Sequence, residues 1–166
     1  MPRSNESVIT IRPLTADDIG WRHEFLLESW GSTMVARREE LVDADKLPGL
    51  VALLDGRPTG LASYTAAARE WELVTIDAVI RGIGIGGALL RAVEALAVAA
   101  NAGRIWLVTT NDNTAALRFY QRNGYDLTAL HRNAVTRARL MRKPQIPLSA
   151  DGIPIRHELE LERILD

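Results

Sequence analysis

The chain contains no cysteine among its 166 residues. This absence excludes disulfide bonds, metal sites built on thiolates and a cysteine nucleophile. It is compatible with a reducing compartment, and we expect a cytoplasmic location. The N-terminal segment from Met1 to Leu14 lacks the apolar core of a signal peptide, and no apolar run approaches the roughly 18 residues of a membrane span. We therefore expect no membrane partner.

An excess of charge of one sign is also lacking. The 20 basic and 21 acidic residues leave a net charge of −1, so no overall field attracts nucleic acid, and we expect none as a partner. The three histidines, His23, His131 and His157, do not form a metal-like cluster, and we predict no metal. The composition, 47% apolar and 25% charged, is typical of a soluble globular protein, and the length suits a single domain over residues 1–166.

The spacing of apolar residues within short segments predicts the secondary structure of the chain. Strands are expected at 8–12, 50–54, 59–66, 72–79, 105–109, 125–130 and 155–161. Helices are expected at 19–30, from 85 to a stop at Gly103, at 113–123 and at 134–141. The charge-rich stretch 32–47 is either a further helix or an ordered loop. The order β-α-α-β-β-β-α-β-α-β-α-β predicts a mixed α/β domain.

A glycine-rich run from Arg81 to Gly87 lies between the strand at 72–79 and the following helix. Glycine lets the backbone approach a ligand closely. The first turn of the helix leaves amide N–H groups unpaired, at the positive end of the helix dipole. The run therefore predicts an anion site, and phosphate is the usual anion in such sites.

A dinucleotide site is one interpretation of these glycines, because Gly82-x-Gly84-x-x-Gly87 matches the dinucleotide fingerprint. That fingerprint belongs on the first strand of a βαβ array, whereas three strands precede it here. It also needs an acid about 20 residues further on, which is missing. An oxidoreductase that binds a dinucleotide is thus an alternative with less support.

A second motif lies between Asn113 and Tyr125, with the spacing N-x-x-A-x-x-F-Y-x-x-x-G-Y. With the glycine run before it, this segment resembles the GNAT family of acyl-CoA-dependent N-acetyltransferases. The resemblance covers residues 8–130 in element order and is most specific over 72–125. It implies a mixed, mostly antiparallel, splayed central sheet flanked by helices.

The resemblance also implies acetyl-CoA as the acyl donor, lying between the strands at 72–79 and 105–109. Ala78 and Val79 would pair their backbone with the pantetheine arm, and one of these N–H groups would polarise the thioester carbonyl. Asn113, Ala116 and Phe119 would flank the arm from the other side. The pyrophosphate would bind the backbone amides of Arg81, Gly82, Ile83, Gly84, Ile85, Gly86 and Gly87.

Two residues are the principal catalytic candidates. The resemblance places Tyr120 where a tyrosine protonates the leaving thiolate, although it could also be a core aromatic residue. Glu72 matches the position of the general base in many relatives, although it could also be a solvated acid at a strand end. Glu28, Asp77 and His157 are the other candidates, and a buried Asp77 would need a partner, which favours a structural role.

The acceptor is expected to be a primary amine on a small molecule or a peptide, whose identity the sequence does not fix. Without cysteine, direct transfer in a ternary complex is the simplest mechanism. A non-catalytic acyl-CoA-binding or regulatory domain is the alternative of a different class. The basic stretch 131–143 is either a solvated helix face or a contact for an acidic acceptor or the CoA phosphates. The sequence does not decide whether the protein forms a homodimer.

Overall fold

The computed structural model describes residues 7–166. The expectation that the N-terminal segment is not a signal peptide concerns, in part, residues 1–6, which lie outside the described residues. Within the described range, a seven-stranded sheet has the strand order β1-β4-β5-β6-β7-β11-β8. Its strands are β1 (Ile9–Pro13), β4 (Gly49–Leu54), β5 (Arg57–Ala67), β6 (Glu70–Ala78), β7 (Arg104–Thr110), β8 (Asp126–His131) and β11 (Glu158–Ile164).

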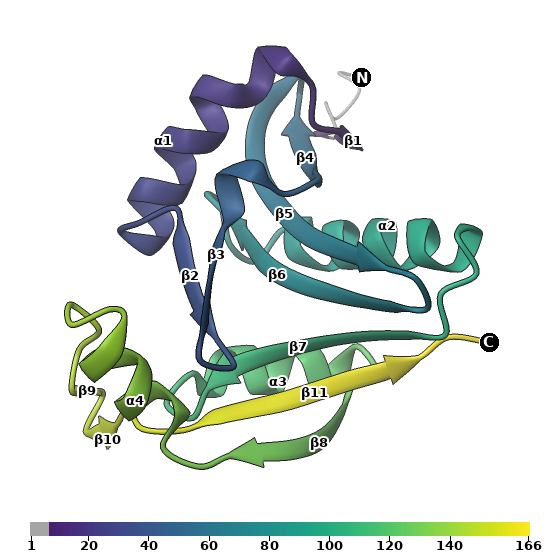
Figure 1. The fold of residues 1–166 in the computed structure, drawn as a ribbon. Helices are drawn as coiled ribbons and strands as arrows, with labels where there is room; N and C mark the ends of the chain where they lie inside the picture. The colour runs from purple at the N-terminus through teal and green to yellow at the C-terminus, as the bar shows by residue number, and fades with distance from the viewer. Residues whose placement is uncertain (1–6) are drawn as a thin grey trace.

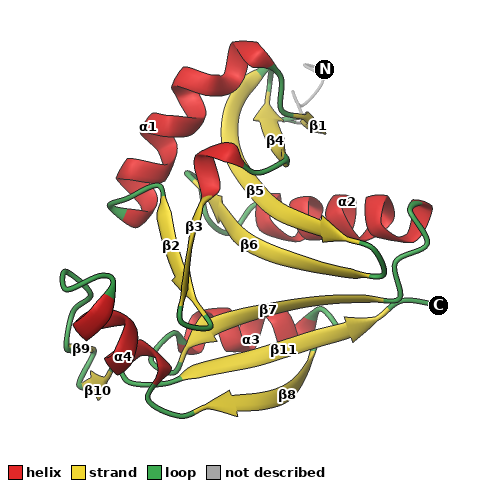
Figure 2. Ribbon diagram, in the orientation of Figure 1, coloured by secondary structure: helices red, strands yellow, loops and turns green. Residues whose placement is uncertain are grey.

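Four α-helices flank this sheet in the described part of the chain: α1 (Ile19–Trp30), α2 (Ile85–Ala99), α3 (Thr114–Arg122) and α4 (Ala134–Met141). Two small hairpins complete the fold: β2 (Met34–Arg37) with β3 (Glu40–Asp43), and β9 (Ser149–Ala150) with β10 (Ile153–Pro154). Figure 2 shows how the helices surround the strands. The predicted fold class, a mixed and mostly antiparallel splayed sheet with flanking helices, is confirmed.

The sheet opens between β6 and β7, its only parallel pair among the described strands. These two strands pair over three residues, from Glu70 opposite Arg104 to Glu72 opposite Trp106, and then diverge (Figure 1). Just after the last pair, the register of β5 against β6 shifts, and Val74 is the extra residue on β6. Because a bulge bends its strand and increases the local twist, the bulge at Val74 helps to direct β6 away from β7.

The two faces of the sheet are covered by different elements. On one face, α2 buries an apolar side against the strands, and Tyr120 of α3 joins the same hydrophobic cluster. On the other face, Phe25 and Leu26 of α1 pack with Val35 of β2 and Leu61 of β5. We call these the α2 face and the α1 face. Residues that alternate along β6 and β7 therefore point to different surroundings.

The stretch 32–47 was expected to be a helix or an ordered loop, and this expectation was wrong. It forms the β2–β3 hairpin, followed by a short 3-10 helix at Ala44–Lys46. The turn residues Arg38 and Glu39 have φ values of +47° and +65°, a conformation that favours glycine, so the sequence carries no hairpin signal there. Contacts with the sheet stabilise the hairpin instead: the Arg38 amide donates to Glu158, and its guanidinium lies 5.1 Å from the Trp106 ring centre.

The predicted ends of the other elements agree more closely with the structure. Gly31 ends α1 in the left-handed conformation, with φ of +72°. The Asp55-Gly56 turn joins β4 to β5 as expected. Helix α2 ends at Ala99, before the predicted stop at Gly103, because Asn101 already adopts a φ of +57°. None of the helices in residues 7–166 has the length and apolar character that a membrane crossing requires.

Candidate active site

A cavity of about 840 Å³ lies where β6 and β7 separate, and we call it the central cavity. Its walls come from the end of α1, from β6, from the loop before α2, from β7 and from α3. It is lined by Ser29, Trp30, Leu73, Val74, Ile76, Asp77, Ala78, Ile80, Arg81, Gly82, Gly84, Ile85, Gly86, Gly87, Val108, Thr109, Asn113, Ala115, Ala116, Phe119, Tyr120 and Arg122. Most of the predicted donor-site residues thus surround one space.

The edge of β6 offers backbone groups to this cavity. The Val79 amide donates to the Thr59 carbonyl on β5, at 2.8 Å, so it points away from β7. Because amides alternate in direction along a strand, those of Ala78 and Ile76 point toward β7. The hydrogen-bond pairing of β6 with β7 has already ended at Glu72, so β7 offers these amides no partner. The Ala78 amide is bonded to the side chain of Asp77, at 2.8 Å. Of the two predicted pantetheine contacts, Ala78 therefore lines the cavity and Val79 does not.

The glycine loop, residues 81–87, forms the next wall. Gly82 and Gly84 have φ values of +83° and +87°, which a residue with a side chain rarely adopts. Gly84 is the N-cap of α2, so the first free amides of that helix begin at this wall. Ile83 is the one loop residue that does not line the cavity, and it is 44% exposed. The loop thus has the backbone shape and the helix end that an anion requires.

Helix α3 supplies the opposite wall. Its N-cap is Asn113, whose side-chain oxygen accepts the amide of Ala116 at 3.1 Å. The helix is followed by Gly124, with φ of +85°. These two local signals fix the ends of the short helix and direct Phe119 and Tyr120 toward β6 and β7. Asn113, Ala116 and Phe119 all line the cavity, and their contact with the pantetheine arm stays a prediction.

Tyr120 is buried, with 7% of its surface exposed, and also lines the cavity. Its ring lies edge-on to Phe119, with 5.1 Å between the centroids. No described residue forms a hydrogen bond with its hydroxyl, yet that oxygen is not among the fully enclosed ones. Burial raises the pKa of the phenol, and the nearby charge of Asp77 raises it further. Tyr120 is thus a core aromatic residue whose hydroxyl remains accessible from the cavity.

Glu72 lies outside the central cavity. It is 2% exposed and accepts a hydrogen bond from the Arg37 guanidinium at 3.0 Å. Burial raises the pKa of its carboxyl, and the charge and hydrogen bond of Arg37 oppose that rise. The interpretation of Glu72 as a solvated acid at a strand end was therefore wrong. Its role as the general base stays a prediction.

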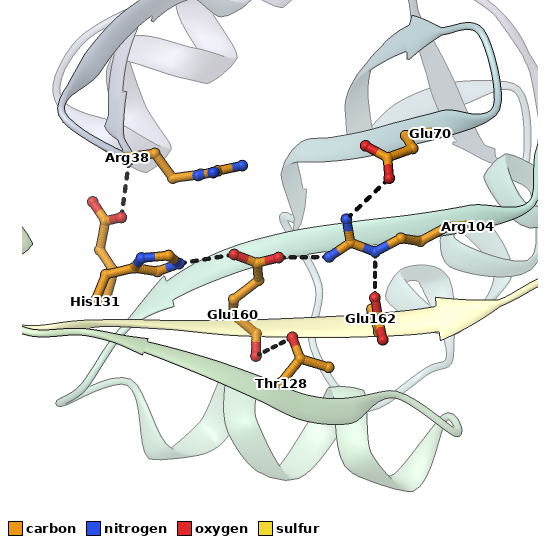
Figure 3. Close-up of polar contacts among 8 residues, drawn as sticks. Arg38, Glu70, Arg104, Thr128, His131, Glu160 and Glu162 are labelled. Atoms are coloured by element: carbon orange, nitrogen blue, oxygen red, sulfur yellow. Dashed lines mark hydrogen bonds and ion pairs between the residues drawn. The ribbon is translucent and has the colours of Figure 1, made fainter.

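A polar network covers the α1 face near the hairpin (Figure 3). Glu160 accepts from Arg104 and lies 2.8 Å from His131, and these hydrogen bonds lower its pKa although burial opposes the effect. Glu158 accepts the Arg38 amide at 2.9 Å, and burial raises its pKa. The carboxylates of β11 therefore hold the hairpin and β7 in place.

The basic stretch 131–143 also contacts the protein itself. Arg137 pairs with Glu39 at the hairpin tip, and Lys143 donates to the Met34 carbonyl at 2.7 Å. Arg139 donates to the carbonyls of Ile146, Pro147 and Ile155. These residues join α4 to the hairpin and to the loop after α4. The interpretation of the stretch 131–143 as a solvated helix face is therefore correct for only some of its residues.

Two other base candidates lie away from the cavity lining. Glu28 is exposed on α1. His157 accepts the Asn133 amide through Nδ1, and partial burial with nearby Arg156 and Arg132 lowers its pKa.

A second hollow, of about 790 Å³, adjoins the central cavity on α3. Ala115, Phe119 and Arg122 line both spaces. Arg118 also lines the hollow, and no acidic residue does. Neither arginine forms an ion pair with a described residue, so two guanidinium groups are available to an anion here. Their spacing of four residues on a helix was visible in the sequence, but its position beside the cavity was not.

Sequence reasoning missed several cavity residues. Ile76, Val108 and Thr109 belong to strands whose apolar pattern reports burial but not where the ladder opens. Trp30, at the end of α1, is 42% exposed and also lines the cavity.

Comparisons with known proteins agree with this geometry. A model of the acetyltransferase (GNAT) family matches residues 17–125. The uncharacterized protein YdhI of Bacillus subtilis (strain 168) is 38% identical over 145 residues, which cover 86% of this chain and 90% of YdhI. Streptothricin acetyltransferase of Streptomyces lavendulae is 33% identical over 92 residues, 53% of this chain and 49% of that protein. The crystal structure of a GNAT acetyltransferase from Elizabethkingia anophelis with acetyl-CoA bound has a TM-score of 0.69 and 20% identity, and the match covers 95% of this chain and 98% of that one.

Proposed function

The chain belongs to the GNAT family of acetyltransferases, and on this premise we propose that it transfers the acetyl group of acetyl-CoA to a primary amine. The chain is accordingly an acyltransferase. The observation that carries the proposal is the central cavity, in which an open strand edge, an anion-binding loop and a tyrosine hydroxyl meet. The dinucleotide alternative has no support, since the glycine loop follows the sixth strand and not the first.

The proposed donor site runs from β6 through the glycine loop to α3. The Ile76 amide points to the open side of β6, where an extended arm can bind as an added strand would, while the Ala78 amide is bonded to Asp77. The glycine loop suits the pyrophosphate, through backbone amides at the start of α2. The hollow with Arg118 and Arg122 suits the 3′-phosphate of the adenosine end, because guanidinium groups bind phosphate well.

Tyr120 is the proposed proton donor to the leaving sulfur. It is the only side chain with a phenolic hydroxyl among the cavity residues, and no described residue competes for that group. Burial raises the phenol pKa, so at neutral pH the proton is present on the oxygen. Transfer is proposed to be direct, within a complex that holds both substrates, since the chain has no cysteine to carry the acetyl group.

The acceptor is proposed to be a small molecule or a peptide that carries a primary amine. The partial likeness to streptothricin acetyltransferase supports acetyl transfer, and it covers about half of that protein. The cytoplasm and a single domain over residues 1–166 remain part of the proposal.

Release of thiol from acetyl-CoA in the presence of a panel of amines tests the function. Because the protein has no cysteine, a thiol reagent reacts with released CoA and not with the protein, so the protein adds no background signal. We expect turnover with at least one class of primary amine. Tight binding of acetyl-CoA without turnover on any amine would favour a non-catalytic acyl-CoA-binding domain instead.

A further inference from the structure

The central cavity contains a single carboxylate among its lining residues, and it belongs to Asp77. The other groups there that can carry charge are Arg81, Arg122 and Tyr120. Glu72 does not line the cavity, and its carboxylate is bonded to Arg37. A base must come within hydrogen-bond reach of the proton that it removes, or act through one water. The position of Asp77 meets this requirement more directly than the position of Glu72.

Asp77 and Tyr120 reach the cavity from opposite faces of the sheet. Asp77 lies opposite Leu61 of β5, and Leu61 packs on the α1 face. Tyr120 comes from α3 and belongs to the hydrophobic cluster of the α2 face. A carboxylate on one side of the opening and a phenol on the other can serve an amine and a sulfur that approach from opposite directions. Direct transfer requires that the amine and the thioester be held together in one site, and this opening has a candidate proton acceptor and a candidate proton donor.

The Asp77 carboxylate is held in place by the backbone. One of its oxygens accepts the Ala78 amide at 2.8 Å, and its other oxygen has no hydrogen bond to a described residue. The sequence favoured a structural role for a buried Asp77. The structure supplies the partner that such a role needs, but that partner uses only one of the two oxygens.

We propose that Asp77, and not Glu72, is the carboxylate that takes the proton from the acceptor amine. This inference rests on the proposed function. The amine nitrogen attacks the thioester carbonyl carbon, so that a C–N bond forms while the C–S bond breaks. The Asp77 carboxylate takes a proton from the nitrogen, and Tyr120 gives its hydroxyl proton to the leaving sulfur. Return of the proton from Asp77 to Tyr120 restores both groups, and the products are the acetylated amine and free CoA.

The charges of the two groups make the two proton transfers cooperative. The negative charge of Asp77 adds to burial in raising the pKa of Tyr120. When Asp77 has accepted a proton, that charge is gone and the phenol becomes a better acid. The proton that leaves the amine therefore promotes the proton transfer to sulfur.

The variant Asp77→Asn separates a catalytic role from a structural one. Asparagine keeps an oxygen that can accept the Ala78 amide, but it cannot take a proton. We expect kcat to fall by about 10²–10⁴-fold, with the affinity for acetyl-CoA changed by less than about threefold. Glu72→Gln tests the other candidate base in the same way, since glutamine can still accept from Arg37. We expect its kcat to fall less than that of Asp77→Asn, and the reverse order would overturn the proposal.

Hydroxylamine as the acceptor supplies a second readout, measured after subtraction of its uncatalysed reaction with acetyl-CoA. Hydroxylamine is a weak base, so its nitrogen becomes a stronger acid after attack on the carbonyl and loses its proton with less help from a base. The defect of Asp77→Asn should then shrink by about tenfold or more. Wild-type turnover by Asp77→Asn, or an equal defect with hydroxylamine and with a strongly basic amine, would overturn the role of Asp77. Absence of turnover by the wild-type protein on every amine would instead overturn the proposed function.

Discussion

The glycine loop makes a quantitative prediction through Gly84→Ala. Gly84 has a φ of +87°, and a Cβ added there meets no atom within 4 Å. The cost of the substitution is therefore conformational and not steric. An L-residue in the left-handed region costs about 1–2 kcal/mol, and the loss of chain entropy in the unfolded state returns about 0.4–1 kcal/mol.

The strain can appear in two measurable quantities. If the substituted alanine keeps the positive φ, the free energy of unfolding falls by about 1 kcal/mol, or roughly 2–4 °C in Tm for a domain of this size. If the loop relaxes, the first amides of α2 move and the Kd for acetyl-CoA rises instead. We expect the losses in unfolding and in binding free energy to total about 1 kcal/mol, the strain less the entropy returned by the unfolded state. Urea unfolding and calorimetric titration with acetyl-CoA measure the two parts.

Gly20→Ala in α1 is the matched control. A Cβ at this position also meets nothing within 4 Å, but its φ is not in the left-handed region. Alanine should stabilise the helix by about 0.5–1 kcal/mol and leave the Kd unchanged. If Gly84→Ala behaved like Gly20→Ala, the left-handed backbone of the loop would have no part in donor binding.

Three further predictions each concern one side chain. Arg12 and the Thr15 amide hold the pKa of Asp18 at about 2, below the unfolded value of 3.8, so this stabilisation is present above pH 3.8 and is lost as the pH falls to about 2. Asp18→Asn should thus lower the free energy of unfolding by about 1–2 kcal/mol at pH 7, after allowance for solvent screening, and by much less at about pH 2. Urea unfolding at both pH values measures this difference. Leu89 is fully buried beneath the sheet, and Leu89→Ala should lower the unfolding free energy by about 2–5 kcal/mol without loss of fold by circular dichroism. Arg122→Gln should raise the KM for acetyl-CoA by about 3–10-fold and leave that for 3′-dephospho-acetyl-CoA nearly unchanged, and an equal rise for both donors would exclude a contact with the 3′-phosphate.

The local backbone features around the proposed donor site could be predicted from sequence because their signals are local. Gly84 and Gly124 have the left-handed φ values that their positions implied, and Asn113 caps the helix that carries Tyr120. Each of these features depends on neighbours within a few residues of the chain. The seven strands of the large sheet were expected from the same kind of pattern, but the strands of the two small hairpins were not.

The hairpin and the partners of Glu72 and Glu158 could not be predicted because these contacts are distant in sequence. Arg37 reaches Glu72 across 35 residues, and the Arg38 amide reaches Glu158 across 120. No local pattern marks such pairs, and the hairpin turn uses Arg38 and Glu39 where glycine or asparagine is usual. The same limit applies to Val79, whose amide is directed to Thr59 by the register of β5 against β6.

The central claim is that the cavity between β6 and β7 catalyses acetyl transfer from acetyl-CoA with Tyr120 as the proton donor to sulfur. The most direct test is amine-dependent thiol release by the wild-type protein and by Tyr120→Phe, with the Kd for acetyl-CoA measured on both. The account predicts that kcat falls by about 10²-fold or more while the Kd changes by less than about threefold. Equal kcat values for the two proteins would contradict it.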